Sequence, residues 1–541
     1  VVQIYIYVFR RKIMKVLVSD NLGEAGIKMF QEEEGIDVDV KTGLSPEELK
    51  GIIADYDGLV IRSATKVTED LLNAATKLKV VGRAGIGLDN VDIPAATKRG
   101  VIVMNTPGGN VITTAEHAIA MILSLSRNIP EGTASLKAGR WDKKKLQGRE
   151  IYNKVLGVVG FGKIGSIVAD RARGLRMQVI VYDPFVTPEL IEKSGFESAS
   201  IEELYKKSDY ITVHVPKLKN TTGLINKDAF DQMKDGVMIV NCARGGIVDE
   251  DDLYNAMNSG KVAGAALDVF ESEPPGVCQL FELDHLICTP HLGASTQEAQ
   301  TKVAVDVAGQ IIDYLKNGTV LNAVNVPSVT GDILKKLNPL LTLGNQMGSL
   351  QAQLSKGAVK EVVIEYAGDF KGLDLSPVSI AVLRGLLTHV VKDDVNFVNA
   401  QVLAKERGIK VTEATSDDSG EYINLITVKV ETTEMSNTVT GTIFGKNELR
   451  IVKINNFRLE LIPNGHISLI YNFDKPGAIG SFATLLGKNN INIDQMQVGQ
   501  EEGGKLNIIF LKTNASLPPH VIEEMHQLEL VKTVTPLEFD L

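Results

Sequence analysis

Three side chains suited to proton transfer and anion binding each follow an apolar, strand-like run. Arg244 lies in VNCARGGIVDE, Glu273 in LDVFESEPP and His291 in TPHLGAST. Ligands of open α/β sheets bind outside the carboxyl ends of the strands, so we expect these side chains to meet there. An imidazole can take the proton of an alcohol, a carboxylate can orient that imidazole, and a guanidinium can hold a substrate carboxylate by two hydrogen bonds. A single histidine at a strand end is more often structural, but the combination favours catalysis at an alcohol group.

The glycine-rich run VLGVVGFGKIG at residues 155–165 predicts a dinucleotide-binding turn. Gly160 permits a tight turn, Gly162 lets the backbone approach a pyrophosphate, and Gly165 lets the following helix pack close to the strand. Asp183 ends the next apolar run, QVIVYD. Its carboxylate can accept hydrogen bonds from ribose hydroxyls and would repel a 2′-phosphate, so NAD is favoured over NADP. The alternative is a glycine-rich strand–helix turn in a domain that binds no ligand.

Bulk composition indicates a soluble, multidomain protein. The 541 residues have room for three or four domains of ~100–200 residues each, and a hydrophobic fraction of 44% is ordinary for globular chains. A net charge of −10 argues against nucleic acid or an anionic membrane as a general partner, but leaves room for local basic pockets. Cys242, Cys278 and Cys288 are too few and wrongly spaced for a disulfide framework or a zinc site. We therefore expect no metal and a reducing, cytoplasmic location.

The first 13 residues, VVQIYIYVFRRKI, are apolar and then basic. The apolar part is shorter than the ~20 residues that span a bilayer, and a signal peptide would carry its charge before the apolar part. Met14 directly precedes the strand-like KVLVSD. We expect residues 1–13 to lie upstream of the folded unit, and no other stretch is long and apolar enough for a membrane helix.

The elements that must position these side chains form two alternating series of strands and helices. From Lys15 to about residue 105, helical segments with the N-cap residues Ser45 and Thr68 alternate with apolar strands, which predicts a parallel sheet. A second series over 155–290 contains six strand-like runs, as a Rossmann sheet requires. Long helical patterns at 113–127 and 296–314 suggest two crossings between lobes. The first domain would then be discontinuous, with substrate between the lobes.

The chain changes character after Pro327. Residues 328–462 read as mixed α and β without chemical motifs, and residues 464–541 read as strand, helix, strand, strand, helix, strand, a pattern of ferredoxin-like folds. The predicted domains are a discontinuous substrate domain (14–112 and 296–327), a nucleotide domain (113–295), an intervening domain (328–463) and a C-terminal domain (464–541).

Several of these stretches together resemble the D-isomer-specific 2-hydroxyacid dehydrogenase family, and within it the long phosphoglycerate dehydrogenases. The resemblance is close over about residues 14–327 and less specific beyond. It implies a Rossmann-type doubly wound nucleotide domain inserted in a flavodoxin-like substrate domain, followed by an α+β intervening domain and a ferredoxin-like βαββαβ ACT domain. The matching stretches are IRSATKVT (61–68), VGRAGIGLDNVD (81–92), MNTPGGN (104–110), VVGFGKIG, HVPKLKNTTGLIN (214–226), NCARGGIVDE, GAALDVFESEPP and PHLGAST.

The resemblance also implies roles for individual residues. Arg244 would bind the substrate carboxylate, Glu273 would pair with the catalytic histidine, and His291 would be the general acid/base. The implied NAD-binding positions are Gly160, Gly162, Lys163, Ile164, Gly165, Asp183, Ile86, Val215, Cys242, Ala243, Asp268, Gly293 and Ala294. The implied substrate-binding positions are Arg62, Ser63, Arg83, Gly85 and Asn110, and the implied effector-binding positions are Asn472, Asp474 and Asn492.

The implied reaction is NAD-dependent oxidation of D-3-phosphoglycerate to 3-phosphohydroxypyruvate, the first step of L-serine biosynthesis, with L-serine as effector and a homotetrameric assembly. One alternative is a glyoxylate or hydroxypyruvate reductase of the same family, which needs no phosphate clamp. Formate dehydrogenase is disfavoured because that relative lacks an acid at the position of Glu273. A third reading is an NADH-sensing corepressor without turnover, against which the ACT resemblance speaks. The Asp474–Gly477 turn also has a purely structural reading, in which its polar residues bind no effector.

Overall fold

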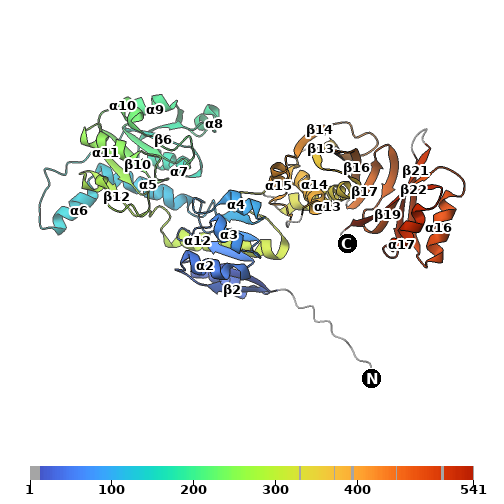
Figure 1. Cartoon of the computed structure of the whole chain (residues 1–541). Coiled ribbons are helices and arrows are strands. Elements are labelled where there is room, and N and C mark those ends of the chain that lie inside the picture. Colours follow the sequence, from blue (N-terminus) through green and yellow to red (C-terminus); the bar gives the residue numbers. More distant parts are fainter. Residues whose placement is uncertain are drawn as a thin grey trace, which may run out of the picture.

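The computed structural model describes residues 13–327, 331–370, 372–391, 395–445, 447–500 and 505–539. The segment expected to lie upstream of the folded unit falls, apart from Ile13, outside these residues. Four sheets follow one another, and in Figure 1 the sheet of residues 155–288 lies at the left, the N-terminal sheet in the centre and the two C-terminal sheets at the right.

The N-terminal sheet is parallel, with the strand order β2-β1-β3-β4-β5. This is the flavodoxin-like order, as predicted. Ser45 and Thr68 cap α2 and α3 by accepting the N–H groups of Glu48 and Leu71, as their positions in the sequence suggest. The strands are β1 (Met14–Val18), β2 (Ile36–Val40), β3 (Gly58–Ile61), β4 (Val80–Arg83) and β5 (Ile102–Asn105). The helices are α1 (Glu24–Glu32), α2 (Pro46–Ile52), α3 (Glu69–Ala74) and α4 (Ile93–Lys98), with the 3₁₀ turn η1 (Ile53–Asp55).

The second sheet is also parallel and has the order β12-β11-β10-β9-β6-β7-β8. If these strands are numbered from 1 in chain order and the sheet is read from β8 to β12, the order is 3-2-1-4-5-6 with one more strand at the edge. This is the Rossmann order. The prediction of six strands was wrong by one, because β8 is only two residues long and carries no apolar run. The strands are β6 (Val155–Val159), β7 (Gln178–Tyr182), β8 (Glu197–Ser198), β9 (Tyr210–Val213), β10 (Val237–Asn241), β11 (Val262–Leu267) and β12 (Leu286–Cys288). The intervening helices are α7 (Lys163–Gly174), α8 (Pro188–Lys193), α9 (Ile201–Lys207), α10 (Lys227–Gln232) and α11 (Glu250–Asn258), with the 3₁₀ turn η2 (Gln279–Glu282).

Two long helices link these sheets. α5 (Val111–Ser126) follows β5 of the first sheet but packs against α7, β10 and β11 of the second. α12 (Gln297–Asn317) follows the second sheet and returns to pack against α1 and β4 of the first. The chain therefore crosses twice between the sheets, as predicted. α6 (Ile129–Lys137) projects from the second sheet, at the left edge of Figure 1.

The third sheet is mixed, with the order β14-β13-β15-β16-β17-β18. β13 and β14 are parallel, and the other neighbouring strands are antiparallel. The strands are β13 (Val359–Gly368), β14 (Lys410–Ser416), β15 (Asn424–Thr432), β16 (Ser436–Phe444), β17 (Glu448–Ile454) and β18 (Phe457–Leu461). The helices are α13 (Gly331–Leu354), α14 (Ser376–Thr388) and α15 (Ala400–Glu406).

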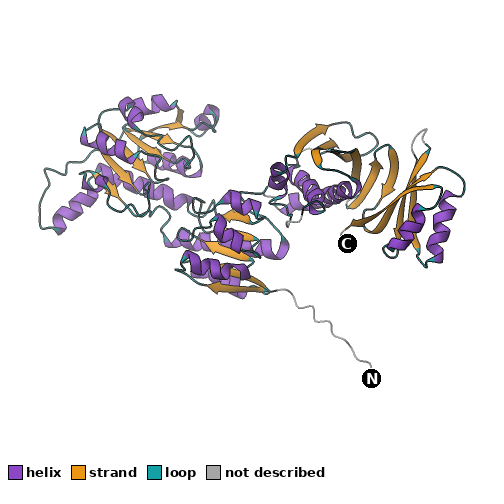
Figure 2. Cartoon of the chain, in the orientation of Figure 1, coloured by secondary structure: helices purple, strands orange, loops and turns teal. Residues whose placement is uncertain are grey.

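The C-terminal sheet is antiparallel and has the order β20-β21-β19-β22, with the predicted βαββαβ sequence of elements. One face packs on α16 and α17 (Figure 2) through residues such as Ile470 and Phe482. The opposite face, with Leu469 and Phe510, joins the hydrophobic core of the third sheet. The elements are β19 (Gly465–Phe473), α16 (Ala478–Lys488), β20 (Ile493–Gln500), β21 (Leu506–Thr513), α17 (Pro519–His526) and β22 (Val531–Phe539).

Among the described residues, no helix combines the length and the apolar character needed to cross a lipid bilayer.

Candidate active site

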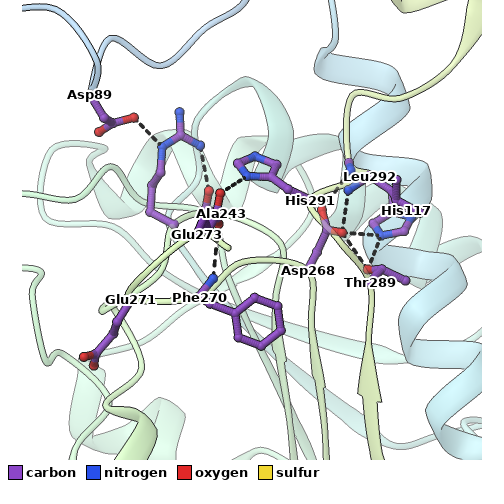
Figure 3. A network of polar contacts seen from close by, with 12 residues as sticks. Asp89, His117, Ala243, Asp268, Phe270, Glu271, Glu273, Thr289, His291 and Leu292 are labelled. Atoms are coloured by element: carbon purple, nitrogen blue, oxygen red, sulfur yellow. Dashed lines mark hydrogen bonds and ion pairs between the residues drawn. The ribbon is translucent and has the colours of Figure 1, made fainter. Parts of the chain in front are cut away.

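His291 and Glu273 form a close pair beyond the ends of β11 and β12 (Figure 3). His291 Nδ1 lies 2.7 Å from Glu273 Oε2, and the Phe270 N–H donates to Glu273 Oε1 at 3.2 Å. Burial raises the pKa of Glu273, but the hydrogen bond and charge of His291 lower it more, so the net pKa lies below its ordinary value. The ionised carboxylate can therefore orient the imidazole and stabilise its protonated form.

The side chain of Arg244, which follows β10 of the second sheet, reaches a loop of the N-terminal sheet. Its Nε donates to Asp89 Oδ2 at 3.0 Å, and Asp89 lies in the loop after β4. The side chain of Asn241 fixes the Arg244 loop by accepting the Ala243 N–H and donating to the Arg244 carbonyl. A Cβ at Gly87 would lie 1.8 Å from Arg244 Nη2, so any other residue there would force this guanidinium to shift. The carboxyl ends of β4 and β10 therefore meet at one site.

Arg83 and Arg62 complete a group of three guanidinium side chains with Arg244. Burial and the nearby charge of Arg244 lower the pKa of Arg83 to about 10, and Arg62 contributes in the same direction. Arg83 still carries its charge at neutral pH. Arg83 Nε donates to Asn90 Oδ1 at 3.2 Å, and Asn90 Nδ2 donates to the Arg62 carbonyl at 2.7 Å. Asn90 thus links the two arginines of the first lobe, and the site is rich in positive charge.

The other predicted substrate-binding residues are Ser63, Gly85 and Asn110, and their surroundings differ. Ser63 is exposed. The Gly85 carbonyl accepts the Thr106 N–H at 3.0 Å, which holds the loop after β4 against the loop after β5. Asn110, at the start of α5, has a buried amide oxygen without a hydrogen-bond partner among the described residues. A substrate contact at these residues stays a prediction.

The glycine turn after β6 fits a dinucleotide pyrophosphate. Gly160 has a φ of 98°, and a Cβ at Gly165 would lie 1.9 Å from the Gly160 carbonyl oxygen, so neither position tolerates another side chain. Nothing lies within 4 Å of a Cβ built at Gly162, where a ligand would approach. α7 begins at Lys163 without a side-chain cap, which leaves its first N–H groups free for phosphate oxygens.

Asp183 lies next to this turn, at the end of β7. Its Oδ2 accepts the Phe161 N–H at 2.7 Å, and its Oδ1 accepts the N–H groups of Phe185 and Val186 at 2.8 and 3.2 Å. These bonds fix the carboxylate beside the glycine turn. Contact with a ribose stays a prediction.

The remaining predicted cofactor positions follow strands of the second sheet, apart from Ile86, which lies in the loop after β4 of the N-terminal sheet. Val215 lies against the glycine turn, since its Cγ1 would be 2.8 Å from a Cβ at Gly160. Cys242 is buried, and burial raises the pKa of its thiol, which disfavours a nucleophilic role; its contact with the cofactor stays a prediction. Ile86 accepts a hydrogen bond from Asn105 through its carbonyl. Lys163 and Ile164 begin α7, directly after the glycine turn, whereas Ala243, Gly293 and Ala294 lie in the loops at the carboxyl ends of β10 and β12.

Asp268, another predicted cofactor position, is held by a network of protein hydrogen bonds, and its contact with the cofactor stays a prediction. Its side chain is 1% exposed, and both carboxylate oxygens accept hydrogen bonds from the protein. One of its partners is His117 on α5, a residue that the sequence analysis did not single out. Asp89 and Asn90 were also missed as site residues, although both lie inside the quoted motif 81–92.

The structure brings together two of the three predicted effector residues. Asn472 pairs with Asn507 across β19 and β21, and Asn507 Nδ2 donates to Asp474 Oδ1 at 2.9 Å. The side-chain oxygens of Asn472 and Asn507 are buried without partners among the described residues. Asn492 instead donates to Asp494 Oδ1 at 2.8 Å through its side chain and to Asn514 Oδ1 at 3.1 Å through its backbone N–H. Asn507 belongs to this cluster and was missed by the sequence analysis.

Within the described part of the chain, no three His, Cys, Asp or Glu side chains gather as ligands of one metal ion would.

Comparison with protein families identifies three segments of the chain. The model of the D-isomer specific 2-hydroxyacid dehydrogenase NAD binding domain matches residues 119–293. The D-3-phosphoglycerate dehydrogenase intervening domain matches residues 336–455, and the ACT domain matches residues 467–530. The predicted cofactor, NAD, is thereby confirmed, as is the predicted fold class.

Individual relatives cover nearly the whole chain. The D-3-phosphoglycerate dehydrogenase of Archaeoglobus fulgidus is 43% identical over 528 residues, which are 97% of this chain and 100% of the relative. The enzyme of that name from Bacillus subtilis is 44% identical over 511 residues, 94% of this chain and 97% of the relative. Among solved structures, an NAD-dependent formate dehydrogenase from Staphylococcus aureus in complex with NAD is 29% identical, with a TM-score of 0.53 over 58% of this chain and 100% of that chain. The chain belongs to the D-3-phosphoglycerate dehydrogenases of the D-isomer-specific 2-hydroxyacid dehydrogenase family.

Proposed function

We propose that this protein oxidises D-3-phosphoglycerate to 3-phosphohydroxypyruvate with NAD, the first step of L-serine biosynthesis. The observation that carries the proposal is the His291–Glu273 pair in a site that also holds three guanidinium groups. The substrate has one carboxylate and one phosphate, so it needs cations at both ends. Relatives that carry the name of this enzyme support the same reading.

Each of these side chains has a distinct task in the proposed reaction. Arg244 holds the C1 carboxylate, and Arg62 and Arg83 hold the phosphate. His291 takes the proton of the C2 hydroxyl, and Glu273 keeps the imidazole in place and stabilises its charge. When bound, NAD supplies the acceptor for the hydride that leaves C2. The Asp89 carboxylate, 3.0 Å from Arg244 Nε, holds the guanidinium in place before the substrate carboxylate arrives.

The phosphate clamp is tested by NADH formation from D-3-phosphoglycerate and by the reverse reaction with hydroxypyruvate. Arg83→Ala should raise KM for the phosphorylated substrate by about 10-fold or more, since a hydrogen bond to a charged group is worth ~1.5–3 kcal/mol. KM for hydroxypyruvate, which has no phosphate, should change much less. An equal change for both substrates would contradict the clamp and favour a glyoxylate or hydroxypyruvate reductase. Intact NADH binding with no turnover on either substrate would favour the corepressor reading.

L-Serine as effector is part of the same proposal. The unpartnered oxygens of Asn472 and Asn507, together with the Asp474 carboxylate, form a set of acceptors suited to an ammonium group. The ACT domain match over residues 467–530 supports a regulatory role for this segment. Added L-serine should lower the rate of NADH formation, and Asn472→Ala should weaken that effect without changing the rate in its absence. A rate that does not respond to L-serine would remove this part of the proposal.

A homotetramer in the cytoplasm completes the proposal. α6 and the loop after it expose large apolar side chains, Ile129, Leu136 and Trp141, and Trp141 is 80% exposed. Apolar surface of this kind is typical of contacts between subunits. The three cysteines are free thiols, as a reducing compartment allows. Sedimentation velocity of the whole chain distinguishes a tetramer from smaller assemblies.

We also propose the four domain ranges predicted from the sequence. The elements of the N-terminal sheet and α12 fall within 14–112 and 296–327, and the strands of the Rossmann sheet fall within 113–295. The third and fourth sheets fall within 328–463 and 464–541.

A further inference from the structure

A buried carboxylate holds the loop that carries His291. Asp268 follows β11, and its Oδ1 accepts the Thr289 hydroxyl at 2.6 Å and the Leu292 N–H at 2.7 Å. Its Oδ2 accepts the Gly293 N–H at 2.8 Å. The Asp268 carbonyl accepts the N–H of His291 itself at 2.9 Å. One residue therefore binds the backbone of three consecutive loop residues.

His117 reaches this carboxylate from α5 (Figure 3). Its Nε2 lies 3.2 Å from Asp268 Oδ1 and 3.2 Å from the Thr289 hydroxyl, and its side chain is 19% exposed. Because an ionised carboxylate only accepts hydrogen bonds, His117 is the donor. Burial raises the pKa of Asp268, but hydrogen bonds from His117 and Thr289 lower it more, so the carboxyl is ionised at neutral pH.

The backbone of His291 needs this restraint. Its φ is +54°, in the left-handed region that residues other than glycine rarely adopt. Such a conformation persists only where the surroundings hold it. If the loop relaxes, the imidazole leaves its position 2.7 Å from Glu273 Oε2. The orientation of the proposed acid/base thus depends on the donors that keep Asp268 charged and in place.

We propose that His117 is a positioning residue for the His291–Glu273 pair. It acts through Asp268: its Nε2–H completes the set of donors around the buried carboxylate, and the carboxylate fixes the loop of residues 291–293. The inference rests on the proposed function, since it takes His291 as the general acid/base. His117 itself meets neither substrate nor cofactor in this role.

Two substitutions at one position separate hydrogen bonding from packing. His117→Leu keeps apolar bulk and removes the donor, and His117→Gln keeps an N–H donor at a similar reach. We expect His117→Leu to lower kcat with D-3-phosphoglycerate by about 100-fold, the size typical of a misplacement of about 1 Å. KM and the affinity for NADH should change little, and His117→Gln should recover most of the lost kcat. Glu116→Gln, at the neighbouring exposed position that pairs with Arg171, is the control and should keep the wild-type kcat.

An equal loss of kcat in both His117 variants would overturn the proposal, because it would indicate packing alone. An unchanged kcat in His117→Leu would overturn it too. If that variant does not fold, Thr289→Val removes a donor from the other side of Asp268, and an unchanged kcat there counts equally against the proposal. His291→Asn separates the two claims: turnover that survives it removes the proposed function, whereas an inactive His291→Asn beside an active His117→Leu removes only the positioning role.

Discussion

Two histidine–carboxylate pairs flank the same loop, and they differ in burial. The His291 and Glu273 side chains are 47% and 37% exposed, whereas those of His117 and Asp268 are 19% and 1% exposed. An exposed pair can meet a substrate and exchange protons with it. A buried carboxylate keeps its charge only while donors surround it, so its pair is suited to holding backbone in place. The same two residue types thus serve chemistry at one end of the loop and structure at the other.

Removing the carboxylate of the exposed pair should produce the larger loss of rate. Glu273→Gln leaves His291 without a charged partner, and we expect kcat to fall by about 100-fold, at the lower end of what acid–base catalysis contributes. The melting temperature should stay close to that of the wild type, because the Glu273 side chain is 37% exposed. A large drop in the melting temperature of Glu273→Gln with a normal kcat would contradict this assignment, because it would give the exposed pair the structural role assigned to His117 and Asp268.

Removing the charge of the buried pair should produce the larger loss of stability. Asp268→Asn places an amide group among hydrogen-bond donors. A buried donor left without a partner lowers the free energy of unfolding by ~1–3 kcal/mol. We therefore expect the melting temperature to fall by about 5 °C.

The pH dependence of this loss has a definite sign. The folded pKa of Asp268 lies below the ordinary 3.8, so its contribution to stability is present above that pH and is lost as the pH falls through the folded pKa. The difference in melting temperature between wild type and Asp268→Asn should therefore be constant near neutrality and narrow below pH 3.8. Calorimetry of both proteins near neutrality and below pH 3.8 measures this difference in melting temperature. A difference that widens as the pH falls would contradict the assigned role of Asp268.

Most of the fold could be predicted because apolar runs and glycines determine it locally. Strand ends in a parallel sheet meet at one edge, so Arg244, Glu273 and His291 could be placed together from their positions after apolar runs. β8 could not be predicted, since its two residues carry no pattern and it forms only by pairing with β7.

Apart from the pairing of Glu273 with His291, the partners of the site residues could not be predicted, because they depend on contacts between distant segments. Asp89 and Arg244 are 155 residues apart, and nothing local marks the pair. His117 lies on a helix whose apolar pattern predicts packing, and only the tertiary structure brings it to Asp268. The resemblance implies Asp268 as a cofactor position, but the hydrogen bonds that its carboxylate accepts from the loop of residues 291–293 become visible only in the structure.

The most direct test of the account is the turnover of His291→Asn with D-3-phosphoglycerate, measured as NADH formation beside NADH binding by fluorescence. We expect kcat to fall by about 1,000-fold or more, within the range attributed to a general base, while NADH binds as in the wild type. Turnover close to that of the wild type, with NADH bound normally, would contradict the assignment of His291 as the acid/base.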